Sequence, residues 1–392
     1  MVPGRSKDAR TRIPTLMNEK IARFLAANSL ETPCLVVDLE TIAEAYDTLH
    51  WHLPLAKIYY ALKANPAPPI IAMLAQKGSN FDVASRSEIE LCLEHGIDAG
   101  RLSFGNTIKK EKDIAFAYEA GIRYFAFDSE DELLKLARSA SGARVFCRIL
   151  VSSTGAEWPL SRKFGCAPEM AFELLRKARA LGLSPYGISF HVGSQQTDVA
   201  QWSGAIQSAA RLFSLLAEAD INLRLINIGG GFPAHYRGEV PAIEDYARAI
   251  MEAITRDFGN DLPEILVEPG RSLVADAGVI ESEVVLISRK TASEDRRWVY
   301  LDVGKFNGLA ETMGESIKYR IETPGRNGPS GPVILAGPTC DSADILYEET
   351  EYRLPLSLEI GDKVGILSAG AYTASYASVG FNGFSPIRTY CI

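Results

Sequence analysis

Residues 58–96 read IYYALKANPAPPIIAMLAQKGSNFDVASRSEIELCLEHG, and the order of strand and helix patterns in this segment indicates the fold class. Two short apolar runs within it, Ile58–Leu62 and Asn80–Ala84, have the length and composition of buried strands. The segment SRSEIELCLEHG (85–96) has helical periodicity and opens with a serine and acidic residues, a typical helix start. Strands that alternate with helices in this way predict parallel pairing.

The same alternation continues as far as Glu268. The further apolar runs are Leu102–Gly105, Arg123–Phe127, Val145–Ile149, Gly187–Val192, Leu225–Gly229 and Ile265–Glu268. Eight strand–helix units predict an α/β fold with a closed (β/α)8 TIM-like barrel over residues 45–275. An open, doubly wound sheet is the alternative, and the regularity of the eight units favours closure.

After Arg271 the alternation of strand and helix patterns gives way to a succession of strand patterns. The runs VIESEVVLIS (279–288), RRWVYLDVG (296–304), PVILAG (332–337) and DKVGILSAG (362–370) are β-like, and Gly, Pro and Asn turns separate them. We therefore predict a C-terminal β-sandwich or β-barrel-like domain at residues 276–392. Residues 31–44 contain the run PCLVVDL, which we expect to add the N-terminal strand to that domain. Residues 1–30 are expected to be an extension that is disordered at first and then forms a helix.

Composition narrows the class of protein. The chain of 392 residues has a net charge of −8, which argues against a nucleic-acid surface and fits a cationic substrate weakly. None of the six cysteines forms a CxxC pair, so we expect no metal site and no disulfide framework. Reduced thiols predict a cytoplasmic location. No apolar run reaches the roughly 18 residues that cross a bilayer.

Lys63 is the first candidate for chemistry. It follows the first predicted barrel strand, and active sites of such barrels lie at the carboxyl ends of the strands. A lysine behind apolar residues is costly to bury unless it is paired, and a Schiff base with an aldehyde gives it a function. On this segment alone, a surface lysine just past a strand is the alternative.

Two glycine-containing motifs predict a phosphate site. INIGGGFP (226–233) and LVEPGRSLV (266–274) follow the seventh and eighth predicted strands, where such barrels often bind phosphate. Three consecutive glycines let backbone N–H groups approach an anion closely. The GxGxxG spacing of a dinucleotide site is absent, and Pro233 interrupts the helix that it would need. Tight turns without a ligand are the alternative.

Five further residues are candidates for the site. Glu268 ends the eighth predicted strand, where a carboxylate needs a cationic partner such as a protonated ring nitrogen. His191 ends the sixth, beside a small polar turn. In AGPTCDSAD, the thiol of Cys340 can act as an acid and the carboxylate of Asp341 can hold an ammonium group. Small residues around Tyr372 predict a tight turn that presents a phenol.

Six motifs in this order resemble the ornithine/lysine/diaminopimelate decarboxylases, which are group IV pyridoxal-phosphate enzymes with the alanine-racemase-like fold (fold type III). They are YALKANP (60–66), HVGSQ (191–195), GGGFP (229–233), EPGR (268–271), GPTCDSAD (337–344) and GAYTASYA (370–377). The resemblance extends from about Thr32 to Phe384. It implies pyridoxal 5′-phosphate as the cofactor.

The resemblance also implies a role for each site residue. Lys63 would carry the cofactor as an internal aldimine, Glu268 would pair with the ring nitrogen, and His191 would stack on the ring. The residues that would hold the phosphate are Ser194, Gly230, Gly231, Gly270, Arg271 and Tyr372, with Asp82 and Arg148 near the lysine and the ring oxygen. Cys340 would protonate the substrate carbon after carbon dioxide leaves, and Asp341 would bind the distal ammonium group. Both would reach the neighbouring subunit's site in a homodimer.

The implied substrates are L-ornithine and L-lysine, which give putrescine and cadaverine for polyamine or other diamine use. The two substrates differ by one methylene, worth only about 1–3 kcal/mol of discrimination. The stretch KFNGLAETMGESIKYR (305–320) offers Glu311 and Glu315, and acidic residues suit a distal ammonium group. We expect Glu315 and Tyr372 to contact the substrate.

Four other activities are alternatives. Diaminopimelate decarboxylases resemble this chain, but they carry a Cys-Glu pair where it has Cys340-Asp341. Biosynthetic arginine decarboxylases of this fold are far longer, so length argues against arginine. The CDSAD motif favours decarboxylation over a racemase of the same fold. A regulatory homologue without catalysis should lack Lys63, Asp82, Glu268 or Cys340, and all four are present.

Overall fold

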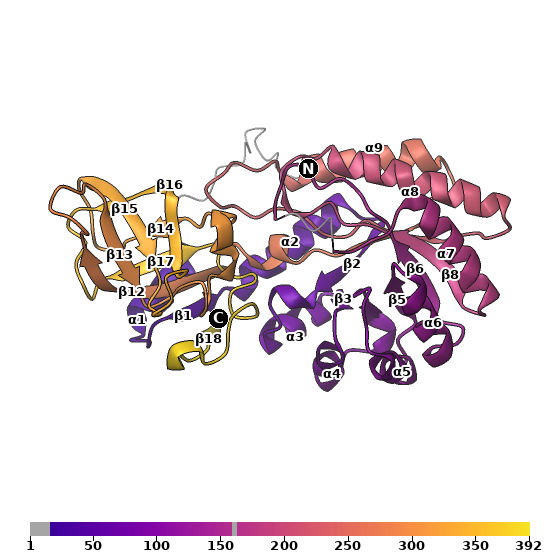
Figure 1. Cartoon of the computed structure of the whole chain (residues 1–392), viewed down its shortest axis with the longest axis horizontal. Coiled ribbons are helices and arrows are strands. Elements are labelled where there is room, and N and C mark those ends of the chain that lie inside the picture. The colour runs from indigo at the N-terminus through magenta and orange to yellow at the C-terminus, as the bar shows by residue number, and fades with distance from the viewer. Residues whose placement is uncertain (1–15, 159–162) are drawn as a thin grey trace, which may run out of the picture.

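The computed structural model describes residues 16–158 and 163–392, so the start of the expected N-terminal extension lies outside the described residues. Figure 1 shows two lobes, a barrel surrounded by helices and a domain of long strands. None of the helices described is long and apolar enough to span a membrane.

Eight parallel strands close into a barrel, which confirms the predicted fold class. They are β2 (Ala56–Ala61), β3 (Asn80–Val83), β4 (Leu102–Phe104), β5 (Tyr124–Phe127), β6 (Arg144–Arg148), β8 (Ser184–Ser189), β10 (Leu225–Asn227) and β11 (Glu264–Val267). Closure occurs between β11 and β2, where Ile265 lies opposite Ala56 and Val267 opposite Ile58. All eight predicted apolar runs therefore contribute strands to the barrel.

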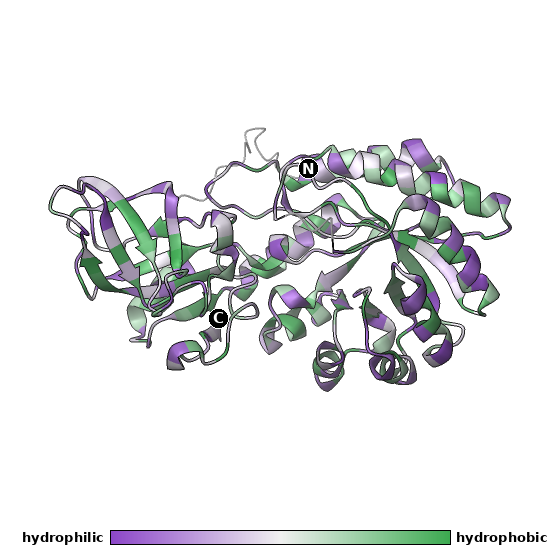
Figure 2. Cartoon of the chain, in the orientation of Figure 1, coloured by the Kyte–Doolittle hydropathy of each residue, from purple (hydrophilic) through white to green (hydrophobic). Residues whose placement is uncertain are grey.

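Helices cover the outside of the barrel, so its strands are buried on both faces. The helices are α2 (Leu39–His52), α3 (Pro68–Gln76), α4 (Arg86–Glu94), α5 (Glu111–Ala120), α6 (Glu130–Ser139), α7 (Pro168–Ala180), α8 (Gln201–Glu218) and α9 (Ile243–Phe258). Burial on both faces explains why the strands are continuous apolar runs rather than alternating ones. Figure 2 shows hydrophobic colour along barrel strands, whereas the surrounding helices carry both hydrophobic and hydrophilic colour.

Helix α4 illustrates how the local sequence sets an element. The hydroxyl of Ser85 accepts a hydrogen bond from the backbone N–H of Glu88 at 3.3 Å. The Glu88 carboxylate in turn accepts one from the backbone N–H of Ala84 at 2.6 Å. This reciprocal capping satisfies N–H groups that have no partner within the helix. The helix therefore begins directly after β3, at the end of the barrel that holds the site.

The second lobe is a mixed sheet of eight strands. They are β1 (Cys34–Val37), β12 (Gly278–Ser288), β13 (Arg297–Leu301), β14 (Ile321–Glu322), β15 (Ser330–Ala336), β16 (Ile345–Pro355), β17 (Lys363–Leu367) and β18 (Arg388–Cys391). Strand β1 pairs antiparallel with β12 and parallel with β18, so the N-terminal strand joins the C-terminal sheet as expected. The expected N-terminal helix is α1 (Glu19–Ala27), whose Ile21 packs with Val36 of β1.

A loop of the β domain lies over the mouth of the barrel. The backbone N–H of Tyr372 donates to the carbonyl of Ala64 at 2.8 Å. The side-chain amide of Asn65 donates to the carbonyl of Gly370 at 2.8 Å. A Cβ at Gly370 would lie 1.8 Å from the carbonyl oxygen of Val274, so only glycine fits this contact. The two domains therefore meet beside Lys63.

Candidate active site

A cavity of about 440 Å³ lies at the carboxyl ends of the barrel strands. It brings together seven of the residues that the sequence predicts: Lys63, Asp82, Arg148, His191, Ser194, Glu268 and Tyr372. It is also lined by Glu311, which the sequence offered for a distal ammonium group, and by residues that sequence reasoning missed, which include Gly105, Asn106, Trp158, Phe164, Ser375 and Tyr376. Five of the predicted residues come from barrel strands or the turns that directly follow them, which explains how distant motifs converge.

Lys63 lies in a single 3-10 turn (Leu62–Ala64) directly after β2, and its side chain opens into the cavity. The hydroxyl of Ser375 donates to the carbonyl of Lys63 at 2.9 Å, which fixes the turn from the β domain. Burial lowers the pKa of Lys63, but Tyr372, Asp82 and Glu268 outweigh burial and raise the pKa overall. The lysine is therefore a cation in a pocket of acidic groups until it reacts with an aldehyde.

Asp82, on β3, is buried and has one carboxylate oxygen without a hydrogen-bond partner in the described structure. Burial and the neighbouring Glu268 raise its pKa well above the ordinary range. A Cβ on Gly105 would lie 2.0 Å from that oxygen, so the glycine leaves the room that Asp82 occupies. A buried carboxylate with an unpaired oxygen indicates space for a polar ligand group.

Glu268 follows β11 and projects into the same cavity. The amide of Asn227, at the end of β10, donates to its carboxylate at 2.5 Å. The other atom of that amide, the oxygen, accepts from the backbone N–H of Gly229 at 2.9 Å. Asn227 therefore orients Glu268 and the glycine loop together, and sequence reasoning did not identify it.

His191 is held as a neutral imidazole. Burial, followed by the charges of Arg148 and Lys63, holds the pKa of His191 well below its ordinary value. Its Nδ1 accepts a hydrogen bond from the backbone N–H of Gly193 at 3.0 Å, which leaves the proton on Nε2. A neutral aromatic ring at this place suits packing against a flat ligand.

The glycine loop is packed too tightly for side chains. A Cβ at Gly230 would lie 2.4 Å from the carbonyl oxygen of Glu268, and one at Gly231 would lie 2.4 Å from that of Gly193. Gly231 also has a φ of 100°, which favours glycine. Gly270 lies under Tyr372, since its Cβ would be 3.2 Å from the phenol oxygen. These close approaches fit a cradle built from backbone N–H groups.

Arg271 lies behind the cavity wall rather than in the lining. It is only 3% exposed, and its guanidinium forms a bidentate ion pair with Glu311, at 2.6 and 2.8 Å. It also donates to the hydroxyls of Ser194 and Tyr236. Sequence reasoning could not find this pair, because Glu311 belongs to the β domain and Arg271 to the turn after the last barrel strand.

Arg148 ends β6, and its guanidinium lies 5.1 Å from the ring centroid of Phe164. Burial lowers its pKa, and Glu268, Asp128 and Asp82 oppose that effect. The cavity therefore contains cationic and anionic groups at close quarters in a partly desolvated space. Such a mixture of perturbed groups is typical of active sites.

The structure does not support substrate contact by Glu315 in this cavity. Glu315 lies outside the lining, and its carboxylate accepts hydrogen bonds from three backbone N–H groups of β16. Their distances are 2.7, 2.8 and 2.6 Å, so both oxygens are occupied. An acidic residue can bind a substrate cation or accept from backbone N–H groups, and sequence does not distinguish the two.

Cys340 and Asp341 also lie outside this cavity. They occupy an exposed turn between β15 and β16. The buried carboxylate of Asp344 holds the turn by accepting from the backbone N–H groups of Lys305 and Thr339, at 2.7 and 3.1 Å, and from the Thr339 hydroxyl. The turn is well ordered by these bonds, yet the chain's own cavity lacks its thiol.

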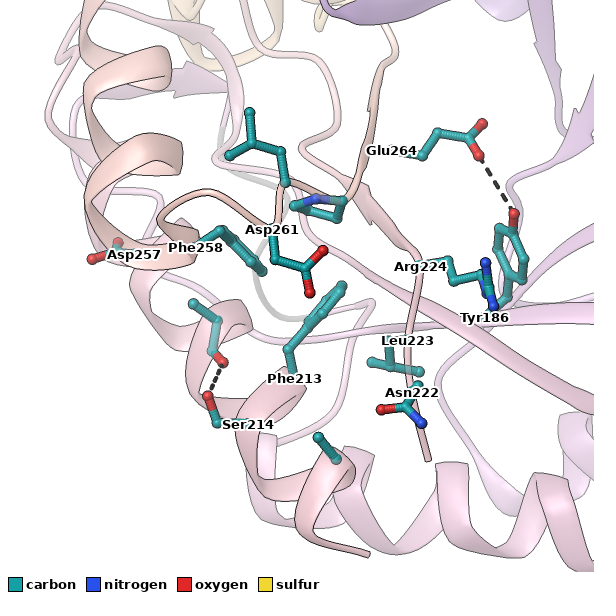
Figure 3. Close-up of a pocket in the computed structure, with 14 residues that line it drawn as sticks. Tyr186, Phe213, Ser214, Asn222, Leu223, Arg224, Asp257, Phe258, Asp261 and Glu264 are labelled. Carbon is teal, nitrogen blue, oxygen red and sulfur yellow. Dashed lines mark hydrogen bonds between the residues drawn. The ribbon is translucent and has the colours of Figure 1, made fainter. Parts of the chain in front are cut away.

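A larger cavity, about 680 Å³, lies at the opposite end of the barrel (Figure 3). It is bounded by the carboxyl ends of α8 and α9 and by the segments that lead into β10 and β11. Figure 3 shows Glu264 and Tyr186 joined across one side, with Asp261 beside Phe213 and Phe258. It contains none of the predicted site residues, so we assign the chemistry to the smaller cavity.

Residues 39–275, more than half of the chain, match the pyridoxal binding domain of the pyridoxal-dependent decarboxylases. The chain belongs to the pyridoxal-dependent decarboxylase family. The lysine/ornithine decarboxylase of Selenomonas ruminantium is 36% identical to this decarboxylase over 370 residues, which cover 94% of this chain and 91% of that protein.

Two solved structures share the fold of this decarboxylase over nearly its whole length. The lysine/ornithine decarboxylase of Vibrio vulnificus, complexed with cadaverine, has a TM-score of 0.86 and 31% identity, covering 96% of this chain and 100% of that one. The arginine decarboxylase of Paramecium bursaria Chlorella virus, bound to agmatine, has a TM-score of 0.88 and 28% identity with the same coverage. An arginine decarboxylase can therefore have a chain of about this length. The prediction that chain length argues against L-arginine as a substrate is wrong.

The cavity of this decarboxylase fits pyridoxal phosphate, the cofactor of its family. It offers the amino group of Lys63 for an aldehyde, the Glu268 carboxylate for a ring nitrogen and a neutral imidazole for a ring face. The unpaired oxygen of Asp82 and the glycine cradle leave room for further polar atoms. The cofactor needs an amine for its aldehyde, a carboxylate for its ring nitrogen and space for its phosphate, and the cavity supplies groups of each type.

Proposed function

We propose that this decarboxylase removes the α-carboxylate of L-ornithine and L-lysine and releases carbon dioxide with putrescine or cadaverine. The observation that carries the proposal is the convergence of Lys63, Glu268 and His191 on one cavity at the carboxyl end of the barrel. The names of the relatives from Selenomonas and Vibrio support this choice of substrates.

Each residue of the cavity would have a separate role. Pyridoxal phosphate, when bound, supplies an electron sink for the pair of electrons that carbon dioxide leaves behind. Lys63 would hold the aldehyde carbon, and Glu268 would hold a proton on the ring nitrogen. His191, kept neutral by burial, would pack on the ring face without adding positive charge. Asn227 holds the Glu268 carboxylate in place through its 2.5 Å hydrogen bond.

We further infer a homodimer in which Cys340 and Asp341 complete the partner subunit's cavity. Their turn is exposed and lies outside the cavity of its own chain, so it is free to enter another. Cys340 would then return a proton to the substrate carbon, and Asp341 would pair with the distal ammonium group. A cytoplasmic location is part of the proposal and is supported by six free cysteines.

L-Arginine is a second candidate substrate, because the viral arginine decarboxylase is matched along its full length. A guanidinium group and an ammonium group both pair with a carboxylate such as that of Asp341, so charge alone does not separate them. meso-Diaminopimelate is disfavoured, since its distal carboxylate would face Asp341. Racemization and a purely regulatory role are disfavoured by the complete set of Lys63, Glu268 and Cys340.

End-point product analysis tests the proposal. Purified protein with pyridoxal phosphate is incubated separately with L-ornithine, L-lysine, L-arginine and meso-diaminopimelate, and amines and carbon dioxide are quantified. We expect putrescine and cadaverine, and their ratio gives the preference between the two substrates. Agmatine alone, or L-lysine from diaminopimelate, would refute the substrate assignment. A Lys63→Ala variant should form no product from any of the four.

A further inference from the structure

Arg271 has no free hydrogen-bond donor in the described structure. A guanidinium has five N–H donors. Two of them reach the carboxylate of Glu311, from Nη1 at 2.8 Å and from Nη2 at 2.6 Å. One reaches the hydroxyl of Tyr236 at 2.7 Å. The remaining two, from Nε at 3.2 Å and from Nη2 at 3.1 Å, converge on the hydroxyl of Ser194.

Ser194 therefore has a defined orientation. A serine hydroxyl has one proton and two acceptor lone pairs. Because Arg271 donates to its oxygen twice, both lone pairs are used and only the proton remains for another partner. Ser194 lines the cavity, whereas Arg271 does not. The proton of Ser194 is thus directed at whatever acceptor occupies this part of the cavity.

Glu311 holds the guanidinium of Arg271 in the position from which it donates to Ser194. Its side chain is 4% exposed and that of Arg271 is 3% exposed, so the pair is formed away from water. Both oxygens of Glu311 accept from Arg271, so its negative charge is already paired with the guanidinium inside the protein. The rings of Tyr372 and Tyr236 lie 4.9 and 5.7 Å from the guanidinium carbon and confine it further.

We propose that Glu311 is a positioning residue for the cofactor phosphate: it locks Arg271 so that Ser194 presents its proton to a phosphate oxygen. The inference rests on the proposed function, since it requires pyridoxal phosphate in this cavity. The sequence suggested that Arg271 holds the phosphate, and Glu311 would be the residue that keeps Arg271 in position. The chain acts on the phosphate through a relay of three side chains.

The test compares two ligands that differ only in the phosphate. Cofactor-free wild type and Glu311→Gln are titrated with pyridoxal phosphate and with pyridoxal, and binding is followed by the visible absorbance of the lysine-bound aldehyde. We expect Glu311→Gln to weaken pyridoxal phosphate about tenfold and pyridoxal less than about twofold, because only the phosphate uses the relay. An equal loss for both ligands would mean a merely structural role and would overturn the proposal. Tighter pyridoxal phosphate binding would overturn it too, because Glu311 would then compete with the phosphate.

A double-mutant cycle tests the relay itself. If Glu311 acts through Ser194, the Glu311→Gln change should have little further effect on phosphate preference in a Ser194→Ala background. Additive effects would overturn the relay. Tyr236→Phe removes one bond to Arg271 without changing charge, and should shift the preference in the same direction by about two- to threefold, whether or not Glu311→Gln folds.

A matched control separates the site from general damage. Glu132→Gln breaks another buried ion pair, that of Glu132 with Lys109, and should leave the ratio of the two affinities unchanged. Wild-type protein that binds neither ligand at Lys63 would overturn the proposed function and this inference with it. Wild-type protein that binds both ligands, with an unchanged ratio in Glu311→Gln, would overturn only the inference.

Discussion

The amide of Asn227 donates a 2.5 Å hydrogen bond to the carboxylate of Glu268, across two adjacent barrel strands. The same side chain accepts from the backbone N–H of Gly229, so one residue joins the carboxylate to the glycine loop. Asn227 is buried. The position of Glu268 therefore depends on its neighbour.

Asn227→Asp should disable this arrangement. The change places a second carboxylate within hydrogen-bond distance of Glu268, and two carboxylates so close cannot both ionise readily. Glu268 would then share a proton instead of holding one on a ring nitrogen. We expect kcat for carbon dioxide release to fall about 10- to 100-fold. Asn222→Asp, at the far end of the barrel, is the control, and a wild-type kcat in Asn227→Asp would contradict the assignment.

Gly105→Ala should displace Asp82. A Cβ at this position would lie 2.0 Å from an oxygen of the Asp82 carboxylate, so the Asp82 side chain must leave its present position. We expect a loss of about 1–3 kcal/mol in the free energy of unfolding together with weaker binding of pyridoxal phosphate. Gly204→Ala, where nothing lies within 4 Å, should be neutral or slightly stabilising because Gly204 is in helix α8. Equal stability of the two variants would refute this reading of the contact.

The barrel could be predicted from sequence because its strands carry one strong signal. Burial on both faces makes β5 and β10 fully apolar or nearly so, and turn residues bound them. Strand β16 was missed for the opposite reason. It is buried at alternate positions along its second half, with glutamates and an arginine between them, so no continuous apolar run marks it.

The site was predictable where chemistry follows a strand end. Lys63, Glu268 and His191 stand directly after barrel strands, so their convergence follows from the topology. The Arg271–Glu311 pair was not predictable, because it depends on how the β domain packs against the barrel. Asn227 offered one signal, since it is a polar residue at the end of a buried apolar run.

His191 should make stability depend on pH. Its pKa in the folded protein lies well below the ordinary value near 6.5, mainly because it is buried. Below pH 6.5 the unfolded chain therefore binds a proton that the folded chain does not, so stability is present above that pH and is lost as the pH falls. Relative to His191→Asn, the wild-type free energy of unfolding should fall by up to about 1.4 kcal/mol per pH unit.

Denaturant unfolding of cofactor-free protein between pH 7 and pH 5 checks this expectation. His95→Asn alters an exposed histidine and should keep the wild-type dependence on pH. If wild type and His191→Asn lose stability in parallel, His191 is not the group responsible.

Glu315→Gln should reduce stability and leave substrate affinity unchanged. The Glu315 carboxylate accepts from the backbone N–H groups of Glu348, Glu349 and Thr350. Burial raises its pKa, but these bonds outweigh burial and lower the pKa overall. We expect the variant to lose about 1–3 kcal/mol of unfolding free energy, since an amide cannot accept all three bonds. A raised KM for L-ornithine or L-lysine would restore the substrate role that the structure does not support.

Complementation between two inactive variants tests the shared site. Lys63→Ala lacks the lysine inside its own cavity, and Cys340→Ala lacks the thiol of the exposed turn. If each cavity takes its thiol from the partner, a mixed dimer contains one complete cavity and one cavity that lacks both groups. Random reassortment of equal amounts should then restore about a quarter of wild-type activity, because half of the dimers are mixed and each has one working site. If Cys340 instead served its own chain, every cavity in the mixture would lack one group, and mixing would restore nothing.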